Sequence, residues 1–164
     1  MRFRRETISV EEARNRLLAR ASVMPQESVD WEEAVGRILA TDLTATYALP
    51  PFDRSAMDGY AVRSSDTADA SVDAPVTLQV IETVLAGDVP QKQLGQGEAA
   101  RIMTGGMIPA GADCVIMFEQ TVNPGELAET VALKKAGKPG ENIIKKAEEV
   151  AEQQIVLKKG EAIN

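Results

Sequence analysis

The chain has 164 residues, of which 44% are hydrophobic and 26% are charged, as is typical of a globular protein with a hydrophobic core. It contains no histidine and one cysteine, which excludes a histidine-dependent catalytic triad, an internal disulfide and a cysteine zinc site. The net charge of −7 argues against general nucleic-acid binding, which depends on neutralising phosphates. No signal core or membrane-spanning apolar run is present, so we expect a cytoplasmic protein that does not bind membranes.

Residues 8–21, "ISVEEARNRLLARA", predict an amphipathic helix. Ser9 is placed to cap its N-terminus, and Glu12 follows three residues later, as in a capping box. Apolar residues recur at helical spacing on one face: Val10, Ala13, Leu17 and Leu18. A second, shorter helix is predicted at about residues 32–38, although Gly36 weakens that prediction.

From residue 44 onward the pattern changes to short runs rich in Val, Ile and Thr, separated by Gly, Pro and Asp. The runs are "APVTLQVIETVLAG", "AARIMT", "DCVIMFEQTV" and "ETVALKKAG". This spacing predicts an antiparallel β domain. Cys114 lies within the third run and is predicted to be a small buried strand residue. Residues 62–75 contain few large apolar side chains and predict a mobile loop.

The stretch "PPFDRSAMDGYAVR", residues 50–63, is the first candidate for chemistry. Its Asp58-Gly59 pair is a strong signal for a type I′ hairpin turn. The preceding residues do not alternate, however, and Pro51 cannot donate to a strand ladder. The stretch therefore predicts either a simple turn or a loop that presents polar side chains: Asp53, Arg54, Ser55 and Asp58.

The second candidate is "RIMTGGMIPAGADCVIM", residues 101–117, in which a predicted strand ends at Thr104. Gly105 and Gly106 allow the backbone to approach a ligand or to adopt positive φ. They also fit a plain connection, because their spacing matches neither phosphate-loop signature. A set of lysines is more simply explained as a solvated strand face than as an anion site: Lys134, Lys135, Lys138, Lys145 and Lys146.

Together with "AVGRILATDL" at residues 34–43, these two stretches resemble the molybdopterin molybdenumtransferase family, which includes the E domain of gephyrin. The resemblance covers nearly the whole chain and implies an α+β, mainly β fold. The implied fold has an N-terminal helix and an elongated linking domain, which together occupy residues 1–43 and 141–164. The linking domain is discontinuous in sequence and incomplete in this chain. An antiparallel β-rich domain is inserted between them, at residues 44–140.

The resemblance also implies an activity. The family inserts molybdate into adenylylated molybdopterin with release of AMP, uses Mg²⁺, and forms homodimers. The β-rich domain of one subunit faces a larger α/β domain of the opposite subunit, which holds most of the pterin and molybdate contacts. That α/β domain is absent from this sequence. We therefore expect a fragment that is catalytically incomplete and inactive alone.

The residues that match the family's motifs are assigned by the same resemblance. Asp58 corresponds to an essential aspartate, and Thr104 to a functional threonine. The neighbouring residues of the motifs are expected to shape the loops or to bind substrate: Asp53, Ser55, Gly59 and Gly105. In an acidic protein without histidine, a carboxylate-held Mg²⁺ is a reasonable way to bring two anions together. Asp58 is thus a candidate metal ligand or a group that orients molybdate, and Thr104 a candidate donor to an anionic oxygen.

The chain departs from the family pattern after the β-rich region. Lys145 and Lys146 stand where arginine is common, which removes the bidentate guanidinium fork. Ala147 and Gln153 stand where glycine is expected. Two other interpretations stay open: a non-catalytic dimeric scaffold or assembly module, as the gephyrin relationship suggests, and a relative that inserts tungstate.

Overall fold

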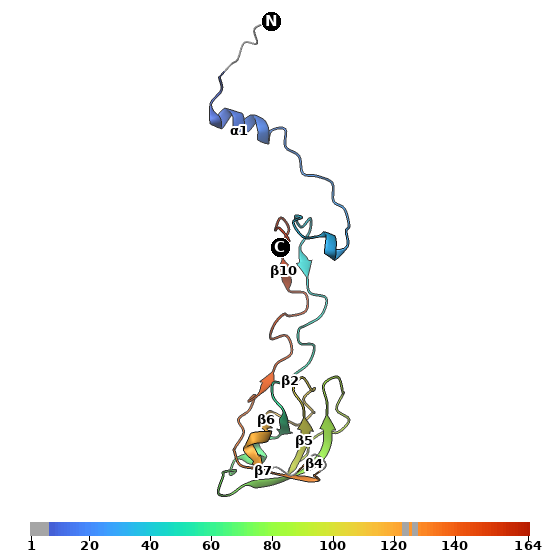
Figure 1. Cartoon of the computed structure of the whole chain (residues 1–164), viewed down its shortest axis with the longest axis vertical. Helices are drawn as coiled ribbons and strands as arrows, with labels where there is room; N and C mark the ends of the chain where they lie inside the picture. The colour runs from blue at the N-terminus through green and yellow to red at the C-terminus, as the bar shows by residue number, and fades with distance from the viewer. Residues whose placement is uncertain (1–6, 123–124, 126–127) are drawn as a thin grey trace. The chain divides into compact units, whose positions relative to one another are not determined.

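A computed structural model gives the fold of residues 7–122, 125 and 128–164 (Figure 1). The regular secondary structure of these residues is mainly β-strand, with one α-helix, which confirms the mainly β prediction. They form two compact units, one containing the described residues up to Thr41 together with Lys159–Asn164, the other Asp42–Lys158. The boundaries of the linking and inserted domains stay a prediction. In the part of the chain described, no helix has the length and apolar character needed to cross a bilayer.

Helix α1, Val10–Leu18, begins as the sequence predicts. The Ser9 hydroxyl accepts a hydrogen bond from the Glu12 backbone N–H at 3.1 Å, which satisfies one of the amides left unpaired at a helix start. The Glu12 carboxylate pairs one turn later with Arg16, at 2.6 Å. The predicted apolar face is exposed in this structure: Val10 is 88% exposed and Leu17 is 73% exposed.

The predicted second helix is wrong. Only a single 3₁₀ turn forms, η1 at Trp31–Glu33. Gly36 adopts a φ of +81°, a left-handed conformation that cannot continue a right-handed helix. The chain instead extends alongside residues 160–163, where the Gly36 N–H donates to the Ile163 carbonyl at 2.7 Å.

A six-stranded sheet forms the main body of the larger unit, in the order β6-β3-β5-β4-β8-β7 (Figure 1). Its strands are β3 Gly59–Val62, β4 Val76–Val84, β5 Glu98–Ile102, β6 Cys114–Met117, β7 Thr121–Val122 and β8 Thr130–Leu133. All four runs identified in the sequence form strands. A short 3₁₀ turn, η3 at Phe118–Gln120, separates β6 from β7.

The expectation of an antiparallel domain is wrong for one pair, because β4 and β5 run parallel. The connection over residues 85–97 is long enough to return the chain to the same end of the sheet before β5 begins. The β4–β5 register shifts between Val80 and Glu82, as at a β-bulge. All other pairs in the sheet are antiparallel, so the sheet is mixed.

Alternating residues of the central strands divide the core into two clusters on opposite faces of the sheet. One contains Tyr60, Val62, Leu78, Ala99, Cys114, Ile116, Val131 and Leu133. The other contains Ala61, Val84, Leu94, Ala100, Ile102 and Val115. Cys114 is fully buried in β6, as predicted, and burial raises the pKa of its thiol to about 12, with a further contribution from the Asp113 carboxylate.

Residues 62–75, predicted to form a mobile loop, are instead anchored. Val62 ends β3, and Ser64–Thr67 form a 3₁₀ turn, η2. Both the backbone N–H and the hydroxyl of Ser64 donate to the Asp113 carboxylate, at 2.6 and 2.7 Å. The Thr67 hydroxyl, which is fully buried, accepts from the Gly137 N–H at 2.9 Å. Polar anchors thus hold a segment that has few large apolar side chains.

Two short antiparallel pairs complete the larger unit. Strand β1, Leu43–Thr44, pairs with β10, Ile155–Leu157. Strand β2, Arg54–Ser55, pairs with β9, Ile143–Ile144. The second pair joins the first candidate stretch, which contains β2, to the returning chain, which contains β9.

Candidate functional site

Asp58 and Thr104, which are 46 residues apart in sequence, meet in the structure. The backbone N–H of Thr104 donates to Asp58 Oδ1 at 2.7 Å, and the Thr104 hydroxyl donates to the same oxygen at 2.7 Å. Both residues are exposed. Asp58 Oδ2 accepts no hydrogen bond from any described residue, so one carboxylate oxygen is held and the other is open to a ligand.

The hydrogen bonds from Thr104 set the charge state of Asp58. They lower the pKa of the carboxyl, the backbone bond having the largest effect, and the positive charge of Arg101 lowers it further. Asp58 is therefore a carboxylate at neutral pH. An ionised carboxylate can only accept hydrogen bonds, so the Thr104 hydroxyl is the donor to Asp58. The lone pairs of that hydroxyl face away from the Asp58 carboxylate.

The predicted type I′ turn at Asp58-Gly59 is not formed. Gly59 begins β3 without a positive φ, and β2 pairs with β9 rather than with β3. The glycine is required for a different reason. A Cβ at this position would lie 2.1 Å from the carbonyl oxygen of Ile116 on the neighbouring strand β6. The close approach of β6 places Asp58, whose own carbonyl accepts from the Phe118 N–H at 3.2 Å.

Backbone hydrogen bonds join the two candidate stretches directly. The Ser55 N–H donates to the Gly106 carbonyl and the Gly105 N–H donates to the Ser55 carbonyl, both at 2.9 Å. Gly105 adopts a φ of +85°, which favours glycine. The buried Ser55 hydroxyl bonds to the backbone of Met57, at the bend before Asp58. Ser55, Gly59 and Gly105 thus all contact backbone in this structure.

Asp53 faces the returning chain. Its carboxylate accepts from the Lys145 ammonium and from the Lys146 N–H, each at 2.8 Å. These two bonds lower the pKa of the Asp53 carboxyl, that from Lys145 most strongly. The Asp53 carbonyl also accepts from the Ile108 N–H at 3.0 Å. Asp53 therefore connects three segments, and Lys145 is engaged in an ion pair.

Sequence reasoning missed Asn142. Its φ is +58°, and its side-chain amide donates to the Val115 carbonyl at 2.8 Å. Its own carbonyl accepts from the Ala56 N–H at 3.0 Å, two residues before Asp58. Asn142 thus supports the Asp58 loop from outside the loop. The available signal was the residue type, since asparagine enters the left-handed region more readily than most residues.

Two residues that stand where the resemblance leads us to expect glycine, Ala147 and Gln153, have a backbone conformation that favours glycine. Ala147 adopts a φ of +65° and Gln153 a φ of +64°. These are left-handed conformations that glycine adopts without steric penalty. The backbone therefore keeps the glycine-type geometry that the resemblance implies, although the side chains at both positions have changed.

The site fits a shared metal ion better than a complete metal cage. Among the described residues, no group of three or more histidine, cysteine or acidic side chains is arranged to hold a metal. Mg²⁺, however, is commonly held by one or two carboxylates together with waters and substrate phosphates. The open Oδ2 of Asp58 is an oxygen donor of that kind, while Oδ1 is held by Thr104.

Comparisons with known proteins identify the family to which the chain belongs. A family model described as MoeA N-terminal region (domain I and II) matches residues 8–164. Molybdopterin molybdenumtransferases of Staphylococcus aureus (strain MRSA252) and Staphylococcus epidermidis are 45% and 41% identical over 161 residues. Each alignment covers 98% of this chain and 38% of the relative, so the chain spans little more than a third of the relatives' length.

Solved structures give the same result. The crystal structure of a molybdopterin biosynthesis MoeA protein from Pyrococcus horikoshii matches with a TM-score of 0.83 and 38% identity, over 97% of this chain and 40% of that protein. The crystal structure of a molybdopterin biosynthesis MoeA protein from Pyrococcus horikoshii OT3 matches with a TM-score of 0.76 and 40% identity, over 84% of this chain and 36% of that protein. The chain belongs to the MoeA N-terminal region family, which comprises domains I and II.

Proposed function

We propose that this chain supplies part of the active site of a molybdopterin molybdenumtransferase, which inserts molybdate into adenylylated molybdopterin and releases AMP. The observation that carries the proposal is the Asp58–Thr104 pair, joined by two hydrogen bonds of 2.7 Å across 46 residues. Family membership supports the same function, because the named relatives are molybdopterin molybdenumtransferases. The remaining contacts come from the part of those proteins beyond this chain's span.

In this proposal, Asp58 is the charged group of the pair and Thr104 positions it. The ionised carboxylate offers Oδ2 to a Mg²⁺ ion, directly or through water, while Oδ1 stays fixed by Thr104. The ion, when bound, offsets the negative charge of the substrate phosphates and molybdate. Ser55, Gly59 and Gly105 hold the two loops at the spacing that the pair requires.

The assembly is part of the proposal and rests on the family resemblance alone. Two subunits form a homodimer in the cytoplasm, and the β-rich region of one faces the α/β domain of the other. We accordingly expect residues 1–164, tested by themselves, to release no AMP. The choice between molybdate and tungstate belongs to that other domain, so a test needs the longest native polypeptide that carries this sequence.

The experiment measures molybdate-dependent AMP release from adenylylated molybdopterin, in the native polypeptide and in Asp58→Asn. Asparagine keeps the shape and an acceptor for Thr104 but removes the charge, so we expect turnover to fall about 100-fold or more. Asp88→Asn is the matched control, because among the described residues the Asp88 carboxylate accepts only from the Leu85 N–H of its own loop. Equal turnover in Asp58→Asn and the control would refute the proposal.

A second candidate function, the dimeric scaffold or assembly module, is favoured by one observation. Helix α1 presents an apolar face on which Val10 and Leu17 are largely exposed. Such a face suits contact with a protein partner. The same variants separate the two functions, because a scaffold should dimerise and support cofactor synthesis equally well with Asn or Asp at position 58.

A further inference from the structure

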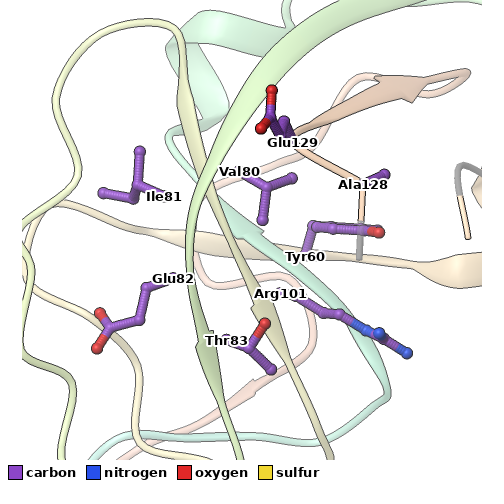
Figure 2. Close-up of a pocket in the computed structure, with 8 residues that line it drawn as sticks. All are labelled: Tyr60, Val80, Ile81, Glu82, Thr83, Arg101, Ala128 and Glu129. Carbon is purple, nitrogen blue, oxygen red and sulfur yellow. The ribbon is translucent and has the colours of Figure 1, made fainter. Parts of the chain in front are cut away.

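Asp58 and Thr104 lie at the same end of the six-stranded sheet. Strand β3 begins directly after Asp58, and β5 ends two residues before Thr104. These strands pair with Tyr60 opposite Arg101, and both side chains line the pocket shown in Figure 2. Residues 54–57, which lead into Asp58, belong to no strand of this sheet. The position of Asp58 therefore also depends on contacts made outside the sheet.

Asn142 holds the segment before Asp58. It directly precedes β9, in which Ile143 pairs with Ser55 of β2. The Asn142 carbonyl accepts a hydrogen bond from the Ala56 N–H at 3.0 Å. This bond fixes the chain two residues before Asp58, just beyond the point where β2 ends.

The same residue also holds the strand that packs beside Asp58. The Asn142 side-chain amide donates to the carbonyl of Val115, a fully buried residue of β6, at 2.8 Å. The Val115 N–H donates in turn to the Glu141 carbonyl at 3.0 Å. Buried backbone groups are costly when unpaired, so these two bonds keep β6 and the returning chain together. Strand β6 packs directly against Gly59, the residue after Asp58.

A left-handed backbone is part of this arrangement. Asn142 has a φ of +58°, and from this position its carbonyl and its side-chain amide bond to two different segments. Asparagine enters the left-handed region more readily than most residues. Glycine would adopt the same backbone but has no amide, and alanine provides neither property. Asparagine therefore meets both requirements of this position.

We propose that Asn142 is a positioning residue for Asp58. It connects Ala56, on one side of Asp58, to strand β6, which packs against the other side, and so keeps the carboxylate within reach of Thr104. Both of its hydrogen bonds are to backbone groups, so Asn142 acts through Asp58 and not on a ligand. Its effect on turnover rests on the proposed function of Asp58, whereas its effect on the Asp58–Thr104 hydrogen bonds does not.

The first experiment measures the Asp58–Thr104 contact without turnover, by NMR of the 164-residue chain. The Thr104 N–H donates to Asp58 Oδ1 at 2.7 Å, so the chemical shift of this amide proton reports the bond. Asp58→Ala gives the shift for complete loss of the bond. Asn142→Ala should move the Thr104 signal toward that value. A variant that only lowers stability leaves the shift of the folded chain unchanged, so an unmoved Thr104 signal would overturn the proposal.

Gln91→Ala is the matched control for this shift. Like Asn142, Gln91 donates from its side-chain amide to a backbone carbonyl, that of Val89, at 2.6 Å, but it lies outside both candidate stretches. The Thr104 signal should not move in this variant, and an equal movement in both variants would overturn the proposal. If Asn142→Ala does not fold, Asn142→Gly decides the test, because it loses the bond to Val115 while relieving the backbone.

The second experiment measures kcat for AMP release in the longest native polypeptide that carries this sequence. The variants are Asn142→Ala, Asp58→Asn and the double variant. Misplacement of Asp58 should lower kcat by about 10-fold or more in Asn142→Ala. Added to Asp58→Asn, the same substitution should cause no further loss, because no carboxylate is left to misplace.

The two experiments distinguish failure of this inference from failure of the proposed function. If Asp58→Asn keeps full turnover, the proposed function is wrong, and the Thr104 shift alone decides the role of Asn142. If Asp58→Asn is impaired and Asn142→Ala lowers kcat by the same factor in both backgrounds, Asn142 does not act through Asp58 and the positioning role is wrong.

Discussion

Helix α1 and the Asp58 loop are both short surface segments, but different interactions form them. The start of α1 depends on neighbours in sequence, through the bond from the Glu12 N–H to Ser9 and the pairing of Glu12 with Arg16. The Asp58 loop depends on distant segments, through Thr104, Gly106 and Asn142. Local rules are therefore enough to predict the first, whereas the second exists only once the sheet has formed.

The largest expected effect comes from the close strand approach at Gly59. Gly59→Ala places a Cβ 2.1 Å from the Ile116 carbonyl oxygen, and backbone cannot yield as a side-chain end can. We expect the free energy of unfolding of the larger unit to fall by about 3 kcal/mol or more. Denaturant unfolding monitored by far-ultraviolet circular dichroism measures this.

Gly95→Ala is the control for that measurement. Its added Cβ would first meet the flexible end of the Glu98 side chain, at 3.2 Å, and the backbone there has no positive φ. A change of about 1 kcal/mol or less is expected. If both substitutions have the same effect, close packing of β3 against β6 does not position Asp58.

Substitutions of Asn142 should have an intermediate effect on stability. Two variants separate its hydrogen bond to Val115 from its left-handed backbone conformation. Asn142→Ala loses the bond to Val115 and keeps a side chain at φ +58°, so we expect about 2 kcal/mol of destabilisation. Asn142→Gly loses the bond but relieves the backbone, so it should be destabilised by only about 1 kcal/mol. Equal unfolding free energies for the two variants would contradict the left-handed conformation.

Ser9→Ala tests whether interactions between neighbours in sequence are enough to stabilise α1. Loss of the cap should destabilise the helix by about 1 kcal/mol and leave the larger unit unchanged, because Ser9 contacts only the start of its own helix among the described residues. Amide hydrogen exchange resolves the two regions. Faster exchange in strands β3 and β5 would show that α1 is not governed by local interactions.

The smallest effect is expected at the two non-glycine residues with positive φ. Ala147→Gly and Gln153→Gly should each stabilise the larger unit by about 0.5–1 kcal/mol, since glycine has no left-handed penalty. Ala151→Gly, at a position without positive φ, is the control and should be slightly destabilising. Thermal unfolding shows whether each variant is more or less stable than the unmodified chain. A stability change of the same sign in all three variants would contradict a left-handed penalty at Ala147 and Gln153.

The parts of the fold that could be predicted are those governed by short-range patterns. Ser9 and Glu12 predict the start of α1, and the Val/Ile/Thr-rich runs predict the strands. The parallel pairing of β4 and β5 could not be read, because strand spacing carries no direction. Residues 64–67 looked mobile because their anchors, Asp113 and Gly137, lie far along the chain.

The site shows the same limit. Asp58 and Thr104 were identified by resemblance, and nothing in the spacing of 46 residues predicts that their side chains meet. The Asp58-Gly59 turn was predicted from a strong local signal, but the glycine serves a tertiary contact with Ile116 instead. Asn142 was missed because its role depends on Ala56 and Val115, which are distant in sequence.

The central claim is that Asp58 and Thr104 act as one unit, and a double-mutant cycle on AMP release tests it most directly. The longest native polypeptide is compared with Asp58→Asn, Thr104→Val and the double variant. Valine removes the hydroxyl bond while leaving the backbone N–H in place. If Thr104 acts through Asp58, the double variant should lose no more turnover than Asp58→Asn alone. Losses that multiply in the double variant would show two independent roles and contradict the account.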